Sequence, residues 1–525
     1  MAIAQNGPGI TGLVTPIKTA YWNHTPMLLV TPQAANKTMG QGGFQEIEQM
    51  NLFADMVCYQ EEVRAAHRIP EVLNRVIEKA IRGSAPAQIN VPRDFWTQVI
   101  DVELPQIVRL ERPSGGAAAI SEAAKLLSGA KFPVILSGAG VVIGGAIPDC
   151  IALAERLDSP VCSGYQHNDS FPGSHPLAAG PLGYNGSKAA MELIAKADVV
   201  LALGTRLNPF STLPGYGIDY WPKDAAIIQV DINSDRIGLT KDVTVAICGD
   251  AKLVAQQILD QLSADAGNAG REDRKATIHQ AKSAWLQTLS SLDHEEDDEG
   301  TTWNADCVTR EPEHMTPRQA WRAIQGGLPK DAIISSDIGN NCAIGNAYPT
   351  FEKGRKYLAP GLFGPCGYGF PSIIGAKIGC PDTPVIGFAG DGAFGISMNE
   401  MTSIGRDDWP AITMVIFRNY QWGAEKRNTI LWYHDNFVGT ELNPNLSYAK
   451  VADGCGLKGV TVRTQAELTS ALKAGVEAQM NGETTFIEVI LNQELGEPFR
   501  RDAMTTPVAV AGISADDMRP QKSAV

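Results

Sequence analysis

The sequence has no apolar run that approaches the roughly twenty residues needed to cross a bilayer as a helix. Its first residues lack the basic region and following apolar region of a secretory signal peptide, so we expect none. Nine cysteines, scattered from Cys58 to Cys455, include no CxxC pair. This pattern fits neither a zinc site nor a disulfide framework. It is typical of a reducing compartment, and we expect a cytoplasmic protein that does not contact a membrane.

Basic residues are also scarce. There are 44 lysines and arginines against 58 aspartates and glutamates, which gives a formal net charge of −14. This balance argues against nucleic acid as a partner, because nucleic acid calls for a basic face. Small anionic substrates stay possible, since a few local cations can reverse the potential inside a cleft. A length of 525 residues, 44% of them hydrophobic, is enough for three or four globular domains.

A dinucleotide fingerprint is missing as well. Gly138-Ala139-Gly140 follows an apolar stretch, but the next glycines are Gly144 and Gly145, so the GxGxxG spacing fails. The surrounding segment still alternates strand and helix patterns and is expected to form an α/β domain. Its expected strands are 133–136, 198–203 and 226–230, and its expected helices include 121–127 and 188–195. Whether this domain holds a nucleotide stays open.

The most informative stretch of the chain runs from residue 384 to residue 423. An apolar run of strand length, Pro384–Ala389, is followed by Gly390-Asp391-Gly392, and a helix is expected to open near Ser397. A second buried strand, Ala411–Phe417, leads to Asn419. Because parallel strands end at the same edge of a sheet, we expect Asp391 and Asn419 to lie side by side.

A carboxylate and an amide oxygen beside a glycine turn suit Mg²⁺, which prefers octahedral oxygen ligation completed by substrate phosphates. The N–H groups of Gly392 and Ala393, at the start of the helix, can bind a phosphate. The residues thus predict a clamp for Mg²⁺ and a diphosphate. An ordinary strand–turn–helix with a surface aspartate is the alternative interpretation.

The GDG turn followed by an asparagine at the end of the next strand resembles the signature of the thiamine diphosphate enzymes. Within that large family, several narrower segments are similar to the sulfoacetaldehyde acetyltransferases, and the resemblance covers nearly the whole chain. These segments are QNGPGIT (Gln5–Thr11), AYWNHTP (Ala20–Pro26), GGFQE (Gly42–Glu46), SSDIGNN (Ser335–Asn341), FGPCGYGFP (Phe363–Pro371), NYQWGAEKRN (Asn419–Asn428), FVGTEL (Phe437–Leu442) and ELGEPFRRDAM (Glu494–Met504).

The resemblance implies an α/β fold with three doubly wound parallel-sheet domains. They are an incomplete pyrimidine-binding domain (1–105), a middle domain (117–262) and a diphosphate-binding domain (317–495), with a polar linker (263–316) and a tail (496–525). The family's ylide-forming glutamate has no counterpart here, because Glu46 and Glu48 lie in a different motif. We therefore expect that the N-terminal part of the first domain is missing.

The resemblance also implies thiamine diphosphate and Mg²⁺ as cofactors. The implied metal ligands are the side chains of Asp391 and Asn419 and the backbone carbonyl of Gln421. Cys366 stands where relatives place a bulky apolar residue that bends the cofactor, and a buried structural cysteine is the alternative. The implied cofactor-binding residues are Ile338, Gly339, Cys366, Gly390, Asp391, Gly392, Ala393, Asn419, Gln421, Trp422 and Gly423.

The implied reaction converts sulfoacetaldehyde and phosphate to acetyl phosphate and sulfite, in a homodimer or homotetramer whose sites form between subunits. Three catalytic candidates follow by position: His24, which could move a proton or bind the sulfonate, and Phe44 and Gln45, near the reacting carbons. Anion-binding candidates are Lys426, Arg427, Arg500 and Arg501, since oxyanions need cations or N–H donors. For each of these residues, a packed or solvated bystander is the alternative.

Two other functions stay open from the sequence. One is a different thiamine diphosphate enzyme, such as an acetolactate synthase or a 2-oxoacid decarboxylase. The other is a truncated chain without catalytic activity, because the ylide-forming glutamate is absent. Release of sulfite from sulfoacetaldehyde in the presence of phosphate would distinguish the implied reaction from the first alternative. Hydrogen exchange at C2 of the thiazolium would argue against the second.

Overall fold

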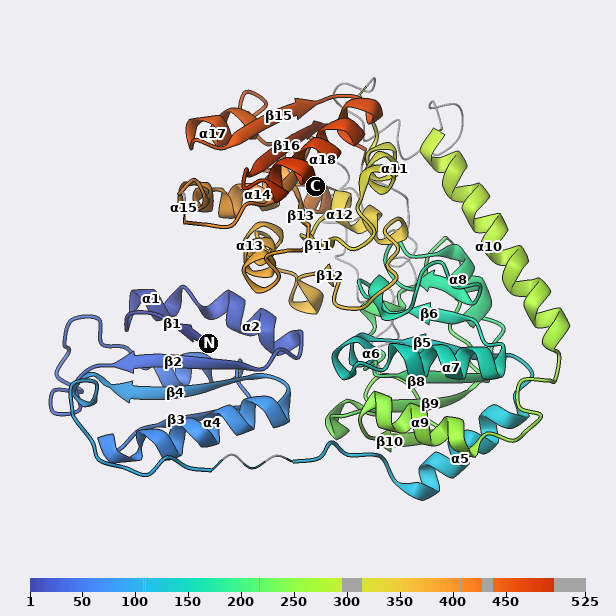
Figure 1. Cartoon of the computed structure of the whole chain (residues 1–525), viewed down its shortest axis with the longest axis horizontal. Helices are drawn as coiled ribbons and strands as arrows, with labels where there is room; N and C mark the ends of the chain where they lie inside the picture. The colour runs from blue at the N-terminus through green and yellow to red at the C-terminus, as the bar shows by residue number, and fades with distance from the viewer. Residues whose placement is uncertain are drawn as a thin grey trace, which may run out of the picture. The chain divides into compact units, whose positions relative to one another are not determined.

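The structure is a computed structural model that describes residues 1–106, 108, 110–216, 218–294, 314–406, 408–426 and 438–494. In this part of the chain, the strands form three sheets whose paired strands all run parallel, as Figure 1 shows. The chain divides into two compact units, Met1–Glu111 with Pro360–Pro365, and Arg112–Ala359 with Cys366–Val525. The predicted α/β class with three parallel sheets is confirmed.

The first unit is built on a sheet with the strand order β1-β2-β4-β3. Strand β4 is buried along its whole length, and helix α4 presents Val72, Val76 and Ala80 to the core at the four-residue spacing of a helix face. The strands are β1 (Ala2–Ile3), β2 (Met27–Gln33), β3 (Tyr59–Glu62) and β4 (Pro86–Pro92). The helices are α1 (Pro8–Thr11), α2 (Val14–Trp22), α3 (Gln49–Phe53) and α4 (Ile69–Gly83).

The second unit begins with a sheet in the order β10-β9-β8-β5-β6-β7. Its central strands β5 and β8 are fully buried apolar runs, as expected for a parallel sheet covered on both faces. The strands are β5 (Pro133–Ser137), β6 (Val161–Ser163), β7 (Ala178–Pro181), β8 (Val199–Leu203), β9 (Ala226–Asp231) and β10 (Val245–Cys248). The helices are α5 (Ala117–Gly129), α6 (Ala139–Gly144), α7 (Ile147–Leu157), α8 (Lys188–Ile194), α9 (Ala251–Gln261) and α10 (Arg271–His294).

The other sheet of the second unit has the order β12-β11-β13-β14-β16-β15, with β13 and β14 at its centre. The strands are β11 (Ile333–Ser336), β12 (Tyr357–Leu358), β13 (Val385–Gly390), β14 (Thr413–Arg418), β15 (Lys458–Val462) and β16 (Thr485–Ile490). The helices are α11 (Pro317–Gly327), α12 (Asn340–Ile344), α13 (Gly369–Gly379), α14 (Asp391–Ser397), α15 (Met401–Ile404), α17 (Tyr448–Gly454) and α18 (Gln465–Met480).

Two elements differ from the prediction. The helix expected to open near Ser397 is α14, which begins at Asp391 and ends at Ser397. Glycines 392 and 395 have low helix propensity and hide this helix in the sequence, whereas burial of Phe394 holds it in place. The predicted linker 263–316 contains α10, which packs mainly on α8 (Figure 1). No helix in the described ranges is both long enough and apolar enough to cross a membrane.

Candidate metal centre

The two central strands of the last sheet bring the predicted ligands to one edge. Strand β13 pairs with β14 so that Gly390 lies opposite Phe417, and both strands end within one residue of that pair. Asp391 therefore follows β13 directly beside the end of β14, where Arg418 and Asn419 stand. Asp391 is 1% exposed and Asn419 is 2% exposed. The polar groups at this edge are thus held away from bulk water.

The Asp391 carboxylate is anchored by backbone N–H groups from both strand ends. The N–H of Tyr420 donates to Oδ2 at 2.7 Å, and the N–H of Gly392 donates to Oδ1 at 3.0 Å. Burial raises the pKa of Asp391 from 3.8 to about 7, although these N–H groups and the Arg418 guanidinium favour the charged form. A buried carboxylate whose charge is only partly balanced is a fitting ligand for a cation.

The loop after β14 is shaped by its pairing with residues 440–442. Tyr420 adopts a left-handed backbone conformation with φ of 62°, and its carbonyl accepts a hydrogen bond from the N–H of Leu442 at 2.8 Å. The N–H of Trp422 donates to the carbonyl of Thr440 at 2.7 Å. Neither bond uses the carbonyl oxygen of Gln421, which leaves that oxygen suited to a metal ion. The buried Oε1 of Gln421 also has no hydrogen-bond partner among the described residues.

The strand next to β13 contributes the loop proposed to face the diphosphate. The Asp337 carboxylate accepts hydrogen bonds from the N–H groups of Ile338 at 2.8 Å, Gly367 at 3.2 Å and Gly369 at 2.6 Å. These bonds join the Ile338-Gly339 turn to the segment that follows Cys366. Burial raises the pKa of Asp337 to about 6, against the effect of the N–H donors.

Three glycines around the edge differ in the space they leave. A methyl group on Gly390 or Gly339 would meet no other atom of the described chain within 4 Å. A methyl group on Gly392 would lie 2.8 Å from the Trp422 ring. Gly392 is therefore needed for packing, while the open positions can admit a ligand. The N–H of Gly392, one of the two predicted phosphate donors, already donates to Asp391. A diphosphate would therefore depend on the N–H of Ala393 and on the open glycines beside it.

The three catalytic candidates lie in the first unit. The side chain of Gln45 accepts a hydrogen bond from Gln5 Nε2 at 2.7 Å, and its carbonyl accepts one from Asn6 Nδ2 at 3.0 Å. The structure thus joins two of the segments that carried the family resemblance, QNGPGIT and GGFQE. Phe44 is 85% exposed, and His24 has a left-handed backbone conformation with φ of 53°.

The anion-binding candidates are placed only in part. Lys426 is 0% exposed, and its Nζ lies 2.7 Å from Oε1 of Glu441. The charge of Lys426 is therefore balanced within the protein, and its contact with Glu441 supports the loop that carries Gln421. Arg427, Arg500 and Arg501 lie outside the described residues.

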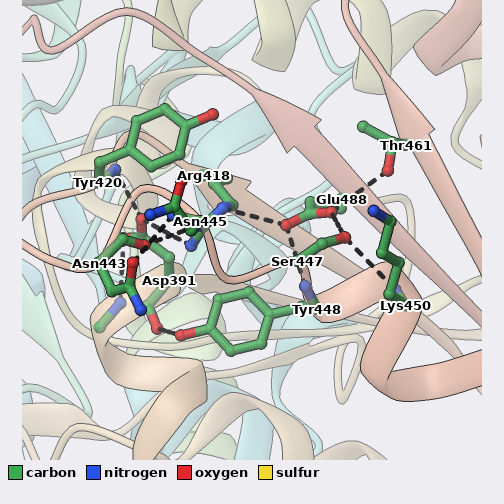
Figure 2. Close-up of polar contacts among 11 residues, drawn as sticks. Asp391, Arg418, Tyr420, Asn443, Asn445, Ser447, Tyr448, Lys450, Thr461 and Glu488 are labelled. Atoms are coloured by element: carbon green, nitrogen blue, oxygen red, sulfur yellow. Dashed lines mark hydrogen bonds and ion pairs between the residues drawn. The ribbon is translucent and has the colours of Figure 1, made fainter. Parts of the chain in front are cut away.

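A buried charged network behind Asp391 was missed by the sequence reasoning. Figure 2 shows Arg418 between Asp391 and Glu488, with Tyr448 beside all of them. The Tyr448 hydroxyl donates to the Asp391 carbonyl at 2.8 Å. A signal was present in the sequence: an arginine ends the apolar strand β14, and a glutamate interrupts the apolar strand β16. A charge inside a buried strand calls for a partner.

Comparison with protein families matches all three sheets to one class. The N-terminal thiamine pyrophosphate (thiamine diphosphate) binding domain matches residues 1–52, the central domain of thiamine pyrophosphate enzymes matches 120–258, and their C-terminal binding domain matches 337–489. The chain belongs to the thiamine pyrophosphate enzymes, as expected from the GDG signature.

The similar proteins narrow that class. A probable sulfoacetaldehyde acetyltransferase of Rhizobium meliloti (strain 1021) is 79% identical over 99% of this chain and 88% of its own length. The sulfoacetaldehyde acetyltransferase of Roseovarius nubinhibens is 73% identical over 99% of this chain and 87% of its own length. A probable acetolactate synthase large subunit of Methanococcus aeolicus is 30% identical over 91% and 79%. Within its class, the chain is a member of the sulfoacetaldehyde acetyltransferase family.

Proposed function

We propose that this enzyme transfers the acetyl group formed from sulfoacetaldehyde to inorganic phosphate and releases sulfite. The observation that carries the proposal is the 70–79% identity to sulfoacetaldehyde acetyltransferases over 99% of the chain. The reaction is redox-neutral overall: the aldehyde carbon becomes the acyl carbon, and the CH₂ group loses sulfite and gains a proton. It therefore needs no nicotinamide or flavin, in keeping with the absent GxGxxG spacing.

We propose that Mg²⁺ is held by the side chains of Asp391 and Asn419 and by the carbonyl of Gln421. The buried, partly balanced carboxylate of Asp391 and the carbonyl of Gln421, which neither of the two loop hydrogen bonds uses, support this assignment. We propose that the cofactor contacts the N–H groups at the start of α14 and the turn at Ile338-Gly339. It is also proposed to contact Cys366, Trp422 and Gly423. When bound, thiamine diphosphate supplies the carbon nucleophile and the electron sink of the reaction.

The protein's own residues bind, orient and exclude water. The buried edge of the sheet provides fixed N–H dipoles for negative charge in a place that water does not reach. We propose that Phe44 and Gln45 lie near the reacting carbons, and that His24 moves a proton or binds the sulfonate. For the anionic groups of both substrates we propose Arg427, Arg500 and Arg501, with Lys426 as a weaker candidate because of its contact with Glu441. A cytoplasmic homodimer or homotetramer stays our prediction for the assembly and its location.

The test supplies the chain with thiamine diphosphate, Mg²⁺, sulfoacetaldehyde and phosphate. We expect sulfite and acetyl phosphate to appear in equal amounts. Without phosphate, we expect no sustained release of sulfite. A parallel reaction with pyruvate in place of sulfoacetaldehyde tests the acetolactate synthase alternative. Formation of acetolactate without sulfite release from sulfoacetaldehyde would overturn the proposal. Exchange of the thiazolium C2 hydrogen without either product would show a chain that only activates its cofactor.

A further inference from the structure

Arg418 is shared unequally between two buried carboxylates. It ends strand β14, so its side chain stands between Asp391, at the end of β13, and Glu488, inside β16. Its Nε lies 3.1 Å from Oε1 of Glu488, whereas its Nη1 lies 3.8 Å from Oδ2 of Asp391. All of these side chains are buried. The guanidinium is thus bonded to Glu488 and only near Asp391.

Further contacts hold Arg418 in the space between the two carboxylates (Figure 2). Its Nη2 donates to the carbonyl of Asn443 at 2.9 Å. The guanidinium carbon lies 4.6 Å from the centre of the Tyr420 ring and 5.3 Å from that of the Tyr448 ring. Cation–π attraction at these distances favours a guanidinium that stays beside both rings. These contacts keep the guanidinium beside Asp391, so its ion pair with Glu488 decides whether it can approach the Asp391 carboxylate more closely.

Glu488 is itself held in place by hydrogen bonds from three residues of two elements (Figure 2). Oε1 accepts from the N–H of Tyr448 at 3.0 Å, and Oε2 accepts from the hydroxyls of Ser447 at 2.7 Å and Thr461 at 3.2 Å. These donors belong to the start of α17 and to strand β15. Glu488 is a fixed anchor for the arginine.

We propose that Glu488 is a positioning residue that holds Arg418 back from Asp391 and so keeps the Asp391 carboxylate available as a metal ligand. The inference rests on the proposed function, in which Asp391 binds Mg²⁺. An arginine released from Glu488 would form a forked pair with Asp391 and compete with Mg²⁺ for the same oxygens. Glu488 also keeps the local charge of the three groups at one negative unit, which favours a divalent cation.

The experiment measures the Mg²⁺ concentration that gives half-maximal binding of thiamine diphosphate to the metal-free full-length chain, by equilibrium dialysis. Glu488→Gln keeps the shape of the side chain, and the hydroxyls of Ser447 and Thr461 can accept as well as donate hydrogen bonds. We expect this variant to need about tenfold more Mg²⁺, the usual scale for an outer-shell residue. Turnover at saturating Mg²⁺ should be largely retained.

The double variant Arg418→Met/Glu488→Gln makes the test independent of how well the single variant folds. It removes the competing arginine together with its anchor, so its Mg²⁺ requirement should return most of the way to that of the wild type. Thr461→Val is the matched control: it deletes one hydrogen bond to Glu488 and leaves every charge in place, so the requirement should not change.

The possible results distinguish failure of the proposed role of Glu488 from failure of the proposed metal site. If cofactor binding by the wild-type chain does not depend on Mg²⁺, the proposed metal site is wrong. If the wild type depends on Mg²⁺ but Glu488→Gln matches it, Glu488 does not position the site. If the double variant needs at least as much Mg²⁺ as the single variant, Glu488 acts only as a structural residue, and the inference is again overturned.

Discussion

The carboxylate of Asp391 carries its charge in a place that water cannot reach. Its N–H donors and the distant guanidinium of Arg418 offset only part of the desolvation cost, so its pKa rises to about 7. A bound Mg²⁺ would reverse this balance, because a cation beside the carboxylate strongly favours the charged form. In the metal-free chain, the buried carboxylate of Asp391 thus lowers the stability of the fold. In the loaded enzyme, the same carboxylate is expected to stabilise the bound Mg²⁺.

The first prediction concerns the pH dependence of stability in the metal-free chain. Between about pH 4 and pH 7, folded Asp391 holds a proton that the unfolded chain has released, because its pKa rises from 3.8 to about 7. The wild type should therefore lose stability relative to Asp391→Asn as the pH rises through this window, by up to about 1.4 kcal/mol per pH unit. Urea unfolding of both chains between pH 4.5 and pH 8 measures the difference.

The informative quantity is how the difference in unfolding free energy between the two chains changes with pH. The hydrogen bond that asparagine cannot make shifts this difference by the same amount at every pH. With saturating Mg²⁺ and thiamine diphosphate at pH 8, the wild type should gain stability and Asp391→Asn should gain little. A difference that stays constant across the pH range would contradict the raised pKa. Equal stabilisation of both chains by the loaded cofactor would remove Asp391 from the metal site.

Single residues of the centre were predictable to different degrees. Asp391 and Asn419 could be identified from the sequence, because each follows an apolar strand and parallel strands share an edge. Arg418 and Glu488 stand on strands that neighbour each other in space but are separated by α17 and α18 along the chain. Their contact depends on the β14–β16 pairing, which no local pattern reveals. Lys426 looked like a free cation because its partner, Glu441, comes from a distant loop.

Two glycines at the start of helix α14 have opposite structural roles. Gly390 precedes the helix with φ of −70° and ψ of 159°, a conformation that alanine adopts freely, and a methyl group there meets open space. A methyl group on Gly392 would press against the Trp422 ring. The first position should therefore tolerate a methyl group in the metal-free chain, and the second should not.

The prediction for this matched pair of variants has two readouts. Gly392→Ala should lower the stability of the metal-free chain by about 1–3 kcal/mol, the usual cost of overpacking. Gly390→Ala should unfold like the wild type yet bind thiamine diphosphate with Mg²⁺ more weakly, because its methyl group occupies space assigned to the cofactor. Urea unfolding and equilibrium dialysis measure the two effects. Normal cofactor binding by Gly390→Ala would place the diphosphate elsewhere.

Elements with strong apolar patterns were predictable to within one or two residues, as the limits of β13, β5 and α8 show. The exceptions have physical causes. Helix α10 is polar over most of its surface, and the apolar side chains it buries among its described residues are Ile278, Ala281, Trp285 and Leu289, which form a narrow stripe. A composition so polar indicates a linker when the sequence is considered alone. Helix α14 is short and glycine-rich, so it depends on tertiary packing.

The molecule as a whole repeats one architecture three times, and this could be expected from the alternation of strand and helix patterns. The grouping into two compact units could not be expected from local patterns. The segment Pro360–Pro365 belongs with the first unit although it lies between elements of the second. Helix α2 makes contacts with residues of this segment, in η7 (Gly361–Phe363). Such a long-range association depends on complementary surfaces of distant segments, which periodicity does not encode.

Binding of the cofactor should change amide hydrogen exchange in one part of the molecule. The proposed clamp lies wholly in the second unit, at the ends of β11, β13 and β14. Thiamine diphosphate with Mg²⁺ should therefore slow amide hydrogen exchange most at residues 337–339, 390–393 and 419–423, because the N–H groups there become bonded or shielded. Free cofactor at one hundred times its dissociation constant should also add about 2.7 kcal/mol to the free energy of unfolding.

Thiamine diphosphate with EDTA is the control and should slow the exchange of few amides. Protection concentrated in the middle sheet, residues 133–248, would instead place a nucleotide-type site there and remove the diphosphate from the edge that Asp391 and Asn419 share.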